Sequence, residues 1–426
     1  MAYARRLWAA AMLAAFSLSS CRPATAAAPA PTHPPATPPQ ASPTAEQLQA
    51  PGDSLSGRVV VWMDWPPAET HWLSGLLSQF GERHQGVQVS LRYIPRAEFH
   101  AKLLSQALLA DGPTILLGPS AWATELYDAG MTQEVTERIS PELRASLTPI
   151  AWSQAEDGEQ MLGVPIELQG MVLYRNPAIL PEAAPNLEEM EQRSAALSSR
   201  RGLVLDLGMR TSMPFMSACG GTLMLVNSGI QVDEAVGTCW LKLLQRMAGM
   251  GTIGSEPDAD LQAFLAGDTA WLVDSVEYLP RIEQALGQTP VIDDWPVYGE
   301  TGKPLSGYTW ALNAYLRSGL GVEDAEASWA FIQFLLSPEA QLDYSRIAGA
   351  AHLPVLAEAW ELSEEMAQAR EILTNNTPYP LARGLAEFTT PLERAARLVA
   401  RQSGEPVSAW RRAMETLRVQ PTASSP

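Results

Sequence analysis

Aromatic and polar side chains that follow short apolar runs are the first residues here whose types suggest binding chemistry. Asp64 and Trp65 follow VVVWM, and Trp122 ends the run TILLGPSAW (114–122). An aromatic ring can stack on the apolar face of a cyclic ligand, while carboxylates and amides bond its hydroxyl groups. The alternative for these tryptophans is that they only pack their own loops.

Motifs for other chemistry are weaker. GMGTIG (249–254) has the glycine spacing of a dinucleotide-binding turn, but it follows a predicted helix at 233–248, so a helix end and loop explain it better. The chain has 5 histidines, none in a ligand-spaced pair with Cys or Asp, and no G-x-S-x-G motif. We therefore expect no catalytic residues, no metal and no cofactor.

Strands and helices alternate in the region that holds Asp64 and Trp122. Apolar periodicity predicts a strand within 57–65 that breaks into a loop, a strand at 87–93, and a buried strand within 114–122 that ends in a turn and opens a helix. Helices are predicted at 69–85 and 97–110. This alternation is typical of βαβ units and a mostly parallel sheet. Ligands of such sheets sit beyond the carboxyl ends of the strands, where the loops at 64–65 and 118–122 are expected.

Two long extended segments separate this region from a second α/β region. They are GVPIELQGMVLYRN (163–176) and SGYTWALN (306–313). The predicted elements between them are helices at 186–200, 233–248 and 277–286, and strands at 203–207, 269–273 and 291–297. After them, 326–341 is predicted as an apolar helix, a Ser-Pro break and the start of a new helix, and 363–418 as several helices.

The N-terminus has the features of an export signal. MAYARR is followed by an apolar run from Leu7 to Leu18, which is too short to span about 30 Å of hydrocarbon. Leu18-Ser19-Ser20-Cys21 resembles a bacterial lipobox. We predict a signal peptide at 1–20, a lipidated Cys21 and a Pro-rich disordered linker at 21–56. An ordinary secretory signal is the alternative.

Composition narrows the class of protein further. The chain has 426 residues, 46% of them hydrophobic, and a formal net charge of −18. That length suggests two domains or one bilobed unit, and the charge argues against nucleic-acid binding, which needs clustered Lys and Arg. If Cys21 is lipidated, Cys219 and Cys239 remain as a pair. A disulfide and two buried free thiols are both open for them.

Several segments, taken in order, resemble the extracellular solute-binding proteins of ABC importers, in the maltose-binding-like group. They are VVVWMDW, YDAGMTQEV (127–135), GVPIELQGMVLYRN, FLAGDTAWLVDS (264–275), GYTWALN and SWAFIQFLLSPEAQ. The likeness covers roughly 57–418. Arg175 departs from it, because the family usually has an aromatic residue there, and Glu277 stands about where the family often has tryptophan.

The resemblance implies an α/β fold with two lobes of the type II periplasmic-binding-protein kind, each lobe a mostly parallel sheet flanked by helices. The expected boundaries are 57–165 and 307–350 for lobe I, and 166–306 and 351–420 for lobe II. It also implies capture of a small solute, a sugar or oligosaccharide, in the cleft, and its delivery to a membrane permease. We expect a monomer without enzymatic activity, exported and anchored at the outer face of the bacterial cytoplasmic membrane.

Position and resemblance together give a set of candidate solute-binding residues. The set is Asp64, Trp65, Ser120, Trp122, Glu167, Gln169, Asp274, Glu277 and Tyr308. Two other classes of function stay open. A secreted glycan hydrolase would need two carboxylates flanking one bond, and a sensory or scaffold lipoprotein would keep the fold without transport.

Overall fold

The computed structural model describes residues 55–197, 201–226, 229–254, 256, 258–358, 362–381 and 385–419. The predicted signal peptide, the predicted lipidation site Cys21 and nearly all of the predicted linker lie outside these residues. No helix among the described residues is both long and apolar enough to cross a bilayer.

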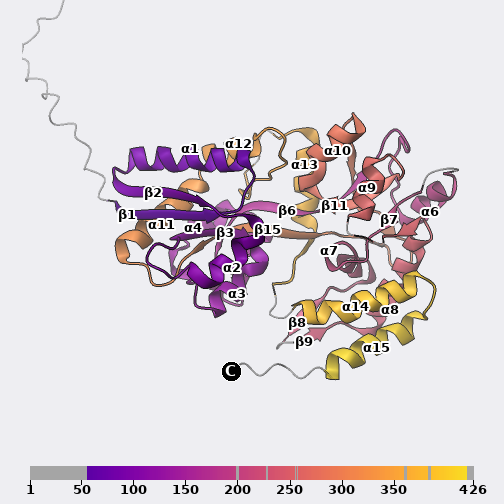
Figure 1. Ribbon diagram of the computed structural model, residues 1–426. Coiled ribbons are helices and arrows are strands. Elements are labelled where there is room, and N and C mark those ends of the chain that lie inside the picture. The colour runs from indigo at the N-terminus through magenta and orange to yellow at the C-terminus, as the bar shows by residue number, and fades with distance from the viewer. Residues whose placement is uncertain are drawn as a thin grey trace, which may run out of the picture. The chain divides into compact units, whose positions relative to one another are not determined.

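A mixed sheet connects the elements on the left of Figure 1 with those on the right, and its strand order is β11-β6-β15-β3-β1-β2. β6 (Val164–Arg175) and β15 (Tyr308–Leu316) occupy its centre and match the two predicted extended segments. β6 pairs with β15 through its first half and with β11 (Trp271–Ser275) through its second half. These two strands therefore run from one lobe into the other.

The first lobe is built on three parallel strands. β1 (Ser56–Met63) pairs with β2 (Gly86–Tyr93) on one side and with β3 (Ile115–Pro119) on the other. α1 (Pro67–Arg83) begins with proline at its first position and buries residues spaced three and four apart, from Leu73 to Phe80, against one face of the sheet. α2 (Arg96–Gln106) packs on the other face through Phe99 and Leu103.

The second lobe has less parallel pairing than the sequence indicates. β11 and β12 (Val291–Asp293) both pair antiparallel with β6. Between the strands of the described residues, parallel pairing here is confined to short ladders, of β7 (Val204–Leu205) with β10 (Thr252–Ile253) and of β16 (Thr377–Pro378) with the start of β15. The reason is that β6 and β15 cross between the lobes in opposite directions and take the central places of the sheet. The two-lobed α/β fold matches the prediction, while the residue boundaries of the lobes stay a prediction.

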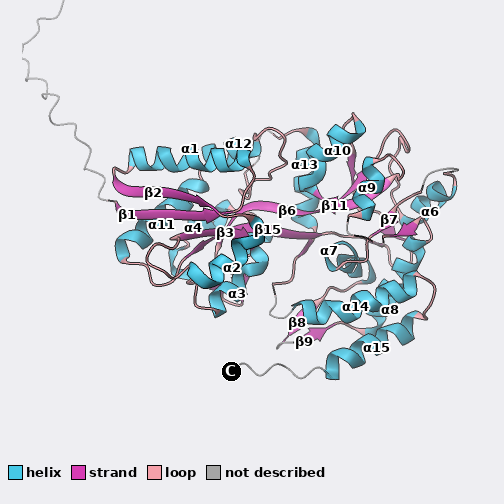
Figure 2. Ribbon diagram, viewed as in Figure 1, coloured by secondary structure: helices cyan, strands magenta, loops and turns pink. Residues whose placement is uncertain are grey.

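Helices cover both faces of the strands in each lobe (Figure 2). Further helices of the first lobe and of the segments joining the lobes are α3 (Ala123–Asp128), α4 (Pro141–Ser146), α5 (Pro149–Trp152), α11 (Val322–Leu335), α12 (Pro338–Ser345) and α13 (Glu364–Asn375). Those of the second lobe are α6 (Leu187–Ala195), α7 (Met209–Ser212), α8 (Glu234–Ala248), α9 (Ala259–Leu265), α10 (Leu279–Leu286), α14 (Leu385–Ala400) and α15 (Pro406–Val419). Short 3₁₀ turns are η2 (Ser120–Trp122), η3 (Thr136–Arg138), η4 (Met213–Cys219) and η5 (Val276–Tyr278). The short strands are β4 (Glu156–Asp157), β5 (Gln160–Met161), β8 (Met224–Val226), β9 (Gly229–Gln231), β13 (Val297–Tyr298), β14 (Lys303–Pro304) and β16 (Thr377–Pro378).

The hydrophobic cores follow the alternation of side chains along the crossing strands. On β6, Val172 and Tyr174 pack into the core that also includes the α1 side of the first lobe. Met171 and Leu173 point to the opposite face and join the core of the second lobe, under α8 and α14. Because both faces of β6 are covered, the strand is apolar almost throughout, which is why the sequence shows a long run without strict alternation.

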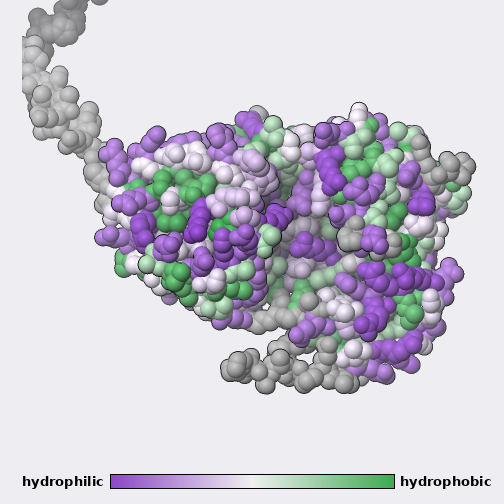
Figure 3. All heavy atoms as spheres, viewed as in Figure 1, coloured by the Kyte–Doolittle hydropathy of each residue, from purple (hydrophilic) through white to green (hydrophobic). Residues whose placement is uncertain are grey.

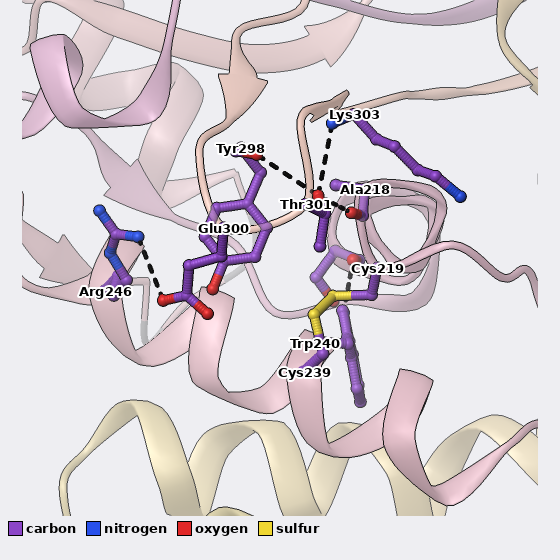
Figure 4. Close-up of a disulfide and its surroundings, with 10 residues drawn as sticks. Ala218, Cys219, Cys239, Trp240, Arg246, Tyr298, Glu300, Thr301 and Lys303 are labelled. Atoms are coloured by element: carbon purple, nitrogen blue, oxygen red, sulfur yellow. Dashed lines mark hydrogen bonds and ion pairs between the residues drawn. A yellow bond between two sulfur atoms is a disulfide. The ribbon is translucent and has the colours of Figure 1, made fainter.

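Cys219 and Cys239 form a disulfide in the second lobe (Figure 4). Their Cα atoms are 5.8 Å apart, and the bridge joins the end of η4 to α8. Of the two alternatives that the sequence leaves open for this pair, the structure has the bridged one.

Candidate solute-binding cleft

A cavity of about 890 Å³ lies among loops of the first lobe, the crossing strands and the second lobe. Its lining residues are Asp64, Trp65, Pro66, Pro67, Ala68, Glu69, Arg96, His100, Gly118, Pro119, Trp122, Glu167, Gln169, Arg210, Glu277, Tyr278, Trp310, Leu312, Tyr344 and 348–352. Figure 3 shows the surface hollowed, with hydrophilic atoms in the hollow, between the first-lobe and second-lobe elements. The volume falls within the range of small-molecule sites, about 300–1,000 Å³.

The elements place these residues as the sheet topology requires. Asp64 and Trp65 follow β1, and Trp122 lies in the turn after β3, so both loops leave the carboxyl ends of parallel strands. Glu277 lies in the turn after β11 and faces them from the second lobe. The cavity is therefore formed at the edges where both lobes end their strands.

Most of the predicted candidates line this cavity. Those that do are Asp64, Trp65, Trp122, Glu167, Gln169 and Glu277. Three candidates lie elsewhere: Ser120, Asp274 and Tyr308.

Ser120 and Tyr308 are buried in the protein instead. The Ser120 hydroxyl donates to the side chain of Gln154 at 3.1 Å and is 0% exposed. Tyr308 is 1% exposed and packs edge-on against Tyr379 in the core of the second lobe. Ser120 directly follows β3 and Tyr308 begins β15, but neither side chain lines the cavity, which position along the chain does not determine.

Asp274 lies in β11, three residues before the cavity-lining Glu277, and is not among the residues that line the cavity. Its carboxylate accepts a hydrogen bond from the backbone N–H of Ser275 at 2.7 Å. Burial, together with the nearby carboxylates of Asp260 and Glu277, raises the pKa of Asp274 to about 8.

No group of three Asp, Glu, His or Cys residues in the described ranges is arranged to hold a metal ion.

The two predicted tryptophans are held by other rings. Trp65 is 7% exposed and stacks on Trp72 and Tyr344, with ring centroids 6.4 and 5.9 Å away. Trp122 stacks on Phe99 at 5.8 Å and lies so close to Gly118 that a Cβ there would stand 2.5 Å from its ring. Each tryptophan therefore offers the cavity part of its ring rather than two open faces.

Sequence reasoning missed three cationic residues of the cavity. Arg96, at the start of α2, donates to Asp64 at 3.1 Å. The guanidinium of Arg210, in α7, lies over the ring of Trp310 at 5.0 Å. Arg96 follows a strand end and could have been found by the same rule as Asp64, whereas Arg210 lies in a short helix that no periodicity marks.

His352 is the third missed residue, and it bonds two carboxylates. Its Nδ1 lies 2.8 Å from Glu167 Oε1, and its Nε2 lies 3.1 Å from Glu69 Oε1. The Tyr344 hydroxyl donates to the other oxygen of Glu167 at 2.7 Å. Burial disfavours the charged ring, but the charges and hydrogen bonds of Glu167 and Glu69 outweigh it and raise the pKa of His352 to about 9. Glu167 thus lines the cavity with both oxygens already engaged.

Glu277 is different, because its side chain is open to solvent in the cavity wall. Although the side chain is accessible from the cavity, partial desolvation by the cavity wall and the charge of Glu167 raise the pKa of Glu277, while the charges of Arg96, Arg210 and His352 lower it. Among the described residues, no side chain donates a hydrogen bond to its carboxylate, while its backbone N–H donates to the Ser275 hydroxyl at 3.4 Å. The cavity therefore presents an acceptor at Glu277, donors at Arg96 and Arg210, and aromatic surface at Trp310, a set suited to a small polar solute.

Two lobes joined by crossing strands, with a polar cavity between them, define a two-lobed binding protein. The profile of the bacterial extracellular solute-binding proteins matches residues 75–374. The chain belongs to that family, whose members are exported binding proteins.

Solved structures share the fold at low sequence identity. The GacH receptor of Streptomyces glaucescens is 18% identical, with a TM-score of 0.69 over 86% of this chain and 99% of that one. The cyclic alpha-maltosyl-1,6-maltose binding protein of Arthrobacter globiformis is 13% identical, with a TM-score of 0.73 over 85% of this chain and 98% of that one. The maltotriose-binding protein of Pyrococcus abyssi is 21% identical over 137 residues, which are 32% of this chain and 30% of that protein.

Proposed function

We propose that this protein is the solute-binding component of an ABC importer and that its solute is a sugar or oligosaccharide. The observation that carries the proposal is the cavity, which combines a free carboxylate at Glu277, guanidinium groups and aromatic rings between two lobes. The similar proteins support the sugar, because one is named for maltotriose, one for cyclic alpha-maltosyl-1,6-maltose, and GacH was solved with acarbose.

The polar groups of the cavity suit paired hydroxyls. Glu277 accepts from hydroxyl groups, and Arg96 and Arg210 donate to them. Trp310 donates its indole N–H to the side-chain oxygen of Gln169 at 2.8 Å, which leaves the side-chain NH₂ of Gln169 as a donor. A sugar that reaches Glu277 and Asp64 together would touch both lobes, and it would stabilise a closed form only through such contacts.

Delivery of the captured solute to a membrane permease is the step that follows binding. The closed form would dock on the permease and release the solute unchanged. Glycan hydrolysis is the rival function, and it needs one carboxylic acid and one carboxylate flanking a bond. The carboxylates of Glu69 and Glu167 each bond a ring nitrogen of His352, so this pair is not free to act as the acid and base of a hydrolase. This supports binding over hydrolysis.

A ligand panel tests the proposed function. Mono- and oligosaccharides, polyols, phosphorylated glycerol compounds and peptides are added to the purified protein, and the thermal midpoint is followed. A solute at about 100 times its Kd should add about 2.7 kcal/mol of apparent stability. The same samples are assayed for new reducing ends. A sugar that raises the midpoint and stays intact supports the proposal; release of reducing sugar would favour the hydrolase.

Glu277→Gln should weaken affinity for the sugar found in this way by about 10- to 100-fold, because a hydrogen bond to a charged group contributes about 1.5–3 kcal/mol. Titration calorimetry measures it. Glu415→Gln, the same change on the exposed face of α15, is the control and should bind like the parent. If Glu277→Gln binds the sugar as tightly as the parent, Glu277 does not contact the sugar.

Membrane anchoring through Cys21 is part of the proposal. Cys21→Ala should leave the signal peptide uncleaved or release the protein from membranes, because the thiol is the acceptor of the lipid. Ser20→Ala keeps a small residue before the cysteine and should still be processed and fractionate with membranes. Processing and fractionation are read by intact mass and by immunoblot of membrane and soluble fractions. A Cys21→Ala protein that behaves like the parent would rule out the lipid anchor.

A further inference from the structure

The segment that follows α12 forms one wall of the cavity with very small side chains. Residues 348–352 read Ala-Gly-Ala-Ala-His, and all five positions line the cavity. Such a segment has little apolar surface with which to fix itself. Its described anchors are the buried Ala351 methyl group, a hydrogen bond from the Ala350 backbone N–H to the Ile347 carbonyl, the pairing of Leu353 with Leu168, and the side chain of His352.

His352 ties this wall to three other elements. It lies between Glu69 on α1 and Glu167 on β6, at 3.1 and 2.8 Å, and its ring stacks on Tyr344 of α12 with centroids 4.0 Å apart. Because both ring nitrogens are engaged by carboxylates, neither is left to donate to a solute. His352 would therefore act on the solute through the wall that it holds.

This arrangement requires the imidazolium form of His352. Glu69 and Glu167 are 8% and 2% exposed, and Glu69 Oε2 has no hydrogen-bond partner among the described residues. A neutral imidazole has a single N–H and can donate to only one of the two carboxylates. Loss of the proton would leave two buried carboxylates close together, one without its partner, which is strongly unfavourable.

We propose that His352 is a positioning residue for solute binding: as an imidazolium between Glu69 and Glu167 it fixes 348–352 as a wall of the cavity, and the protein loses affinity for its solute when that proton is lost. This inference rests on the proposed function and adds a pH dependence to the same site.

The surrounding ionisable groups set the sign of the effect. Glu167 and Glu69 hold the pKa of His352 near 9 against its burial. Glu277, across the cavity, is near enough that the charge of His352 lowers the pKa of Glu277. Burial and the charge of Glu167 raise the pKa of Tyr344 well above its usual value, so this phenol stays protonated through the same range. Affinity should therefore be constant at neutral pH and fall as pH rises through about 9.

Solute affinity against pH is the first test. With the sugar found by the panel, the parent should bind equally at about pH 6 and 8 and about tenfold more weakly at about pH 10. His352→Gln should bind about tenfold more weakly at neutral pH and show no further fall. His71→Gln, on the exposed face of α1 outside the cavity, should follow the parent. A His352→Gln protein with the parent's affinity or the parent's pH profile overturns the inference.

Glu69→Gln keeps the shape of the site while it removes one of the two charges that hold the proton. It should move the fall in affinity to lower pH by about one unit or more. This variant serves if His352→Gln does not fold. An unchanged pH profile for Glu69→Gln would contradict the inference.

A measurement without solute separates this inference from the proposed function. Ala348, Ala350 and Ala351 carry methyl groups that can be labelled and followed by NMR. Their signals should shift or broaden with the deprotonation of His352, and in His352→Gln they should be displaced already at neutral pH. Methyl signals that change neither with the deprotonation of His352 nor in His352→Gln overturn the inference, even if a sugar binds. If no compound of the panel binds, the proposed sugar is refuted, and the methyl signals alone then test whether His352 fixes residues 348–352.

Discussion

Replacing Asp293 by alanine is expected to lower the free energy of unfolding by about 3–5 kcal/mol, because it leaves a buried guanidinium without its partner. Arg175 Nε lies 2.8 Å from Asp293 Oδ2, and the two side chains are only 6% and 5% exposed. The guanidinium also donates to the carbonyls of Leu180 and Pro181, so it cannot leave the interior without breaking those bonds.

The same pair illustrates why a buried ion pair is not in itself stabilising. Burial raises the pKa of Asp293 although Arg175 acts in the opposite direction, which means that desolvation outweighs the attraction. The double variant Arg175→Met/Asp293→Leu should therefore regain most of the loss. The pair also gives a structural role to Arg175, which stands where the resemblance leads one to expect an aromatic residue: its guanidinium is buried as the ion-pair partner of Asp293.

Urea unfolding followed by circular dichroism measures both variants. Asp294→Ala is the matched control. Asp294 is the next residue, is exposed, and bonds only the half-buried Gln368 among the contacts described for it, so its loss should cost less than about 1 kcal/mol. An Asp293→Ala protein as stable as Asp294→Ala would show that the guanidinium finds another way to be solvated.

Removing the disulfide by Cys219→Ala/Cys239→Ala should cost about 3 kcal/mol. The bridge closes a loop between positions 20 apart, and in the chain-entropy model a loop of this size restricts the unfolded chain by that amount. Neighbouring contacts hold the same elements in place: Trp240 donates its indole N–H to the Ser212 carbonyl at 2.8 Å, and Thr301 bonds the Ala218 carbonyl (Figure 4). The folded state should therefore change little.

Denaturant unfolding again gives the measurement, with the parent under a reducing agent as a second route to the same state. The slope of unfolding free energy against urea should rise in the variant, because the freed chain exposes more surface. A loss well under 1 kcal/mol, with an unchanged slope, would mean that the unfolded chain is already compact around this loop.

The sequence by itself determined the order and kind of the elements. The extended run at 163–176 became β6, the run at 306–313 lies within β15 and its approach, and the alternation before them became β1, α1, β2, α2 and β3. Local periodicity is enough for this, because a helix face or a buried strand must carry apolar residues wherever it packs. Strand ends likewise indicated Asp64 and Glu277 as residues of the cavity, and the first crossing segment indicated Gln169.

Only the tertiary structure decided which side chains face the cavity and which are already bonded. Ser120 and Tyr308 stand at strand ends but point into the interior, because one step along a strand reverses the side chain. His352 meets Glu167 and Glu69 across 185 and 283 positions of the chain, so no local pattern could mark them. Burial of Arg175 beside Asp293 likewise depends on the antiparallel pairing of β12 with β6. Contacts of this kind are set by how the two crossing strands bring distant segments together, and that arrangement exists only in the folded chain.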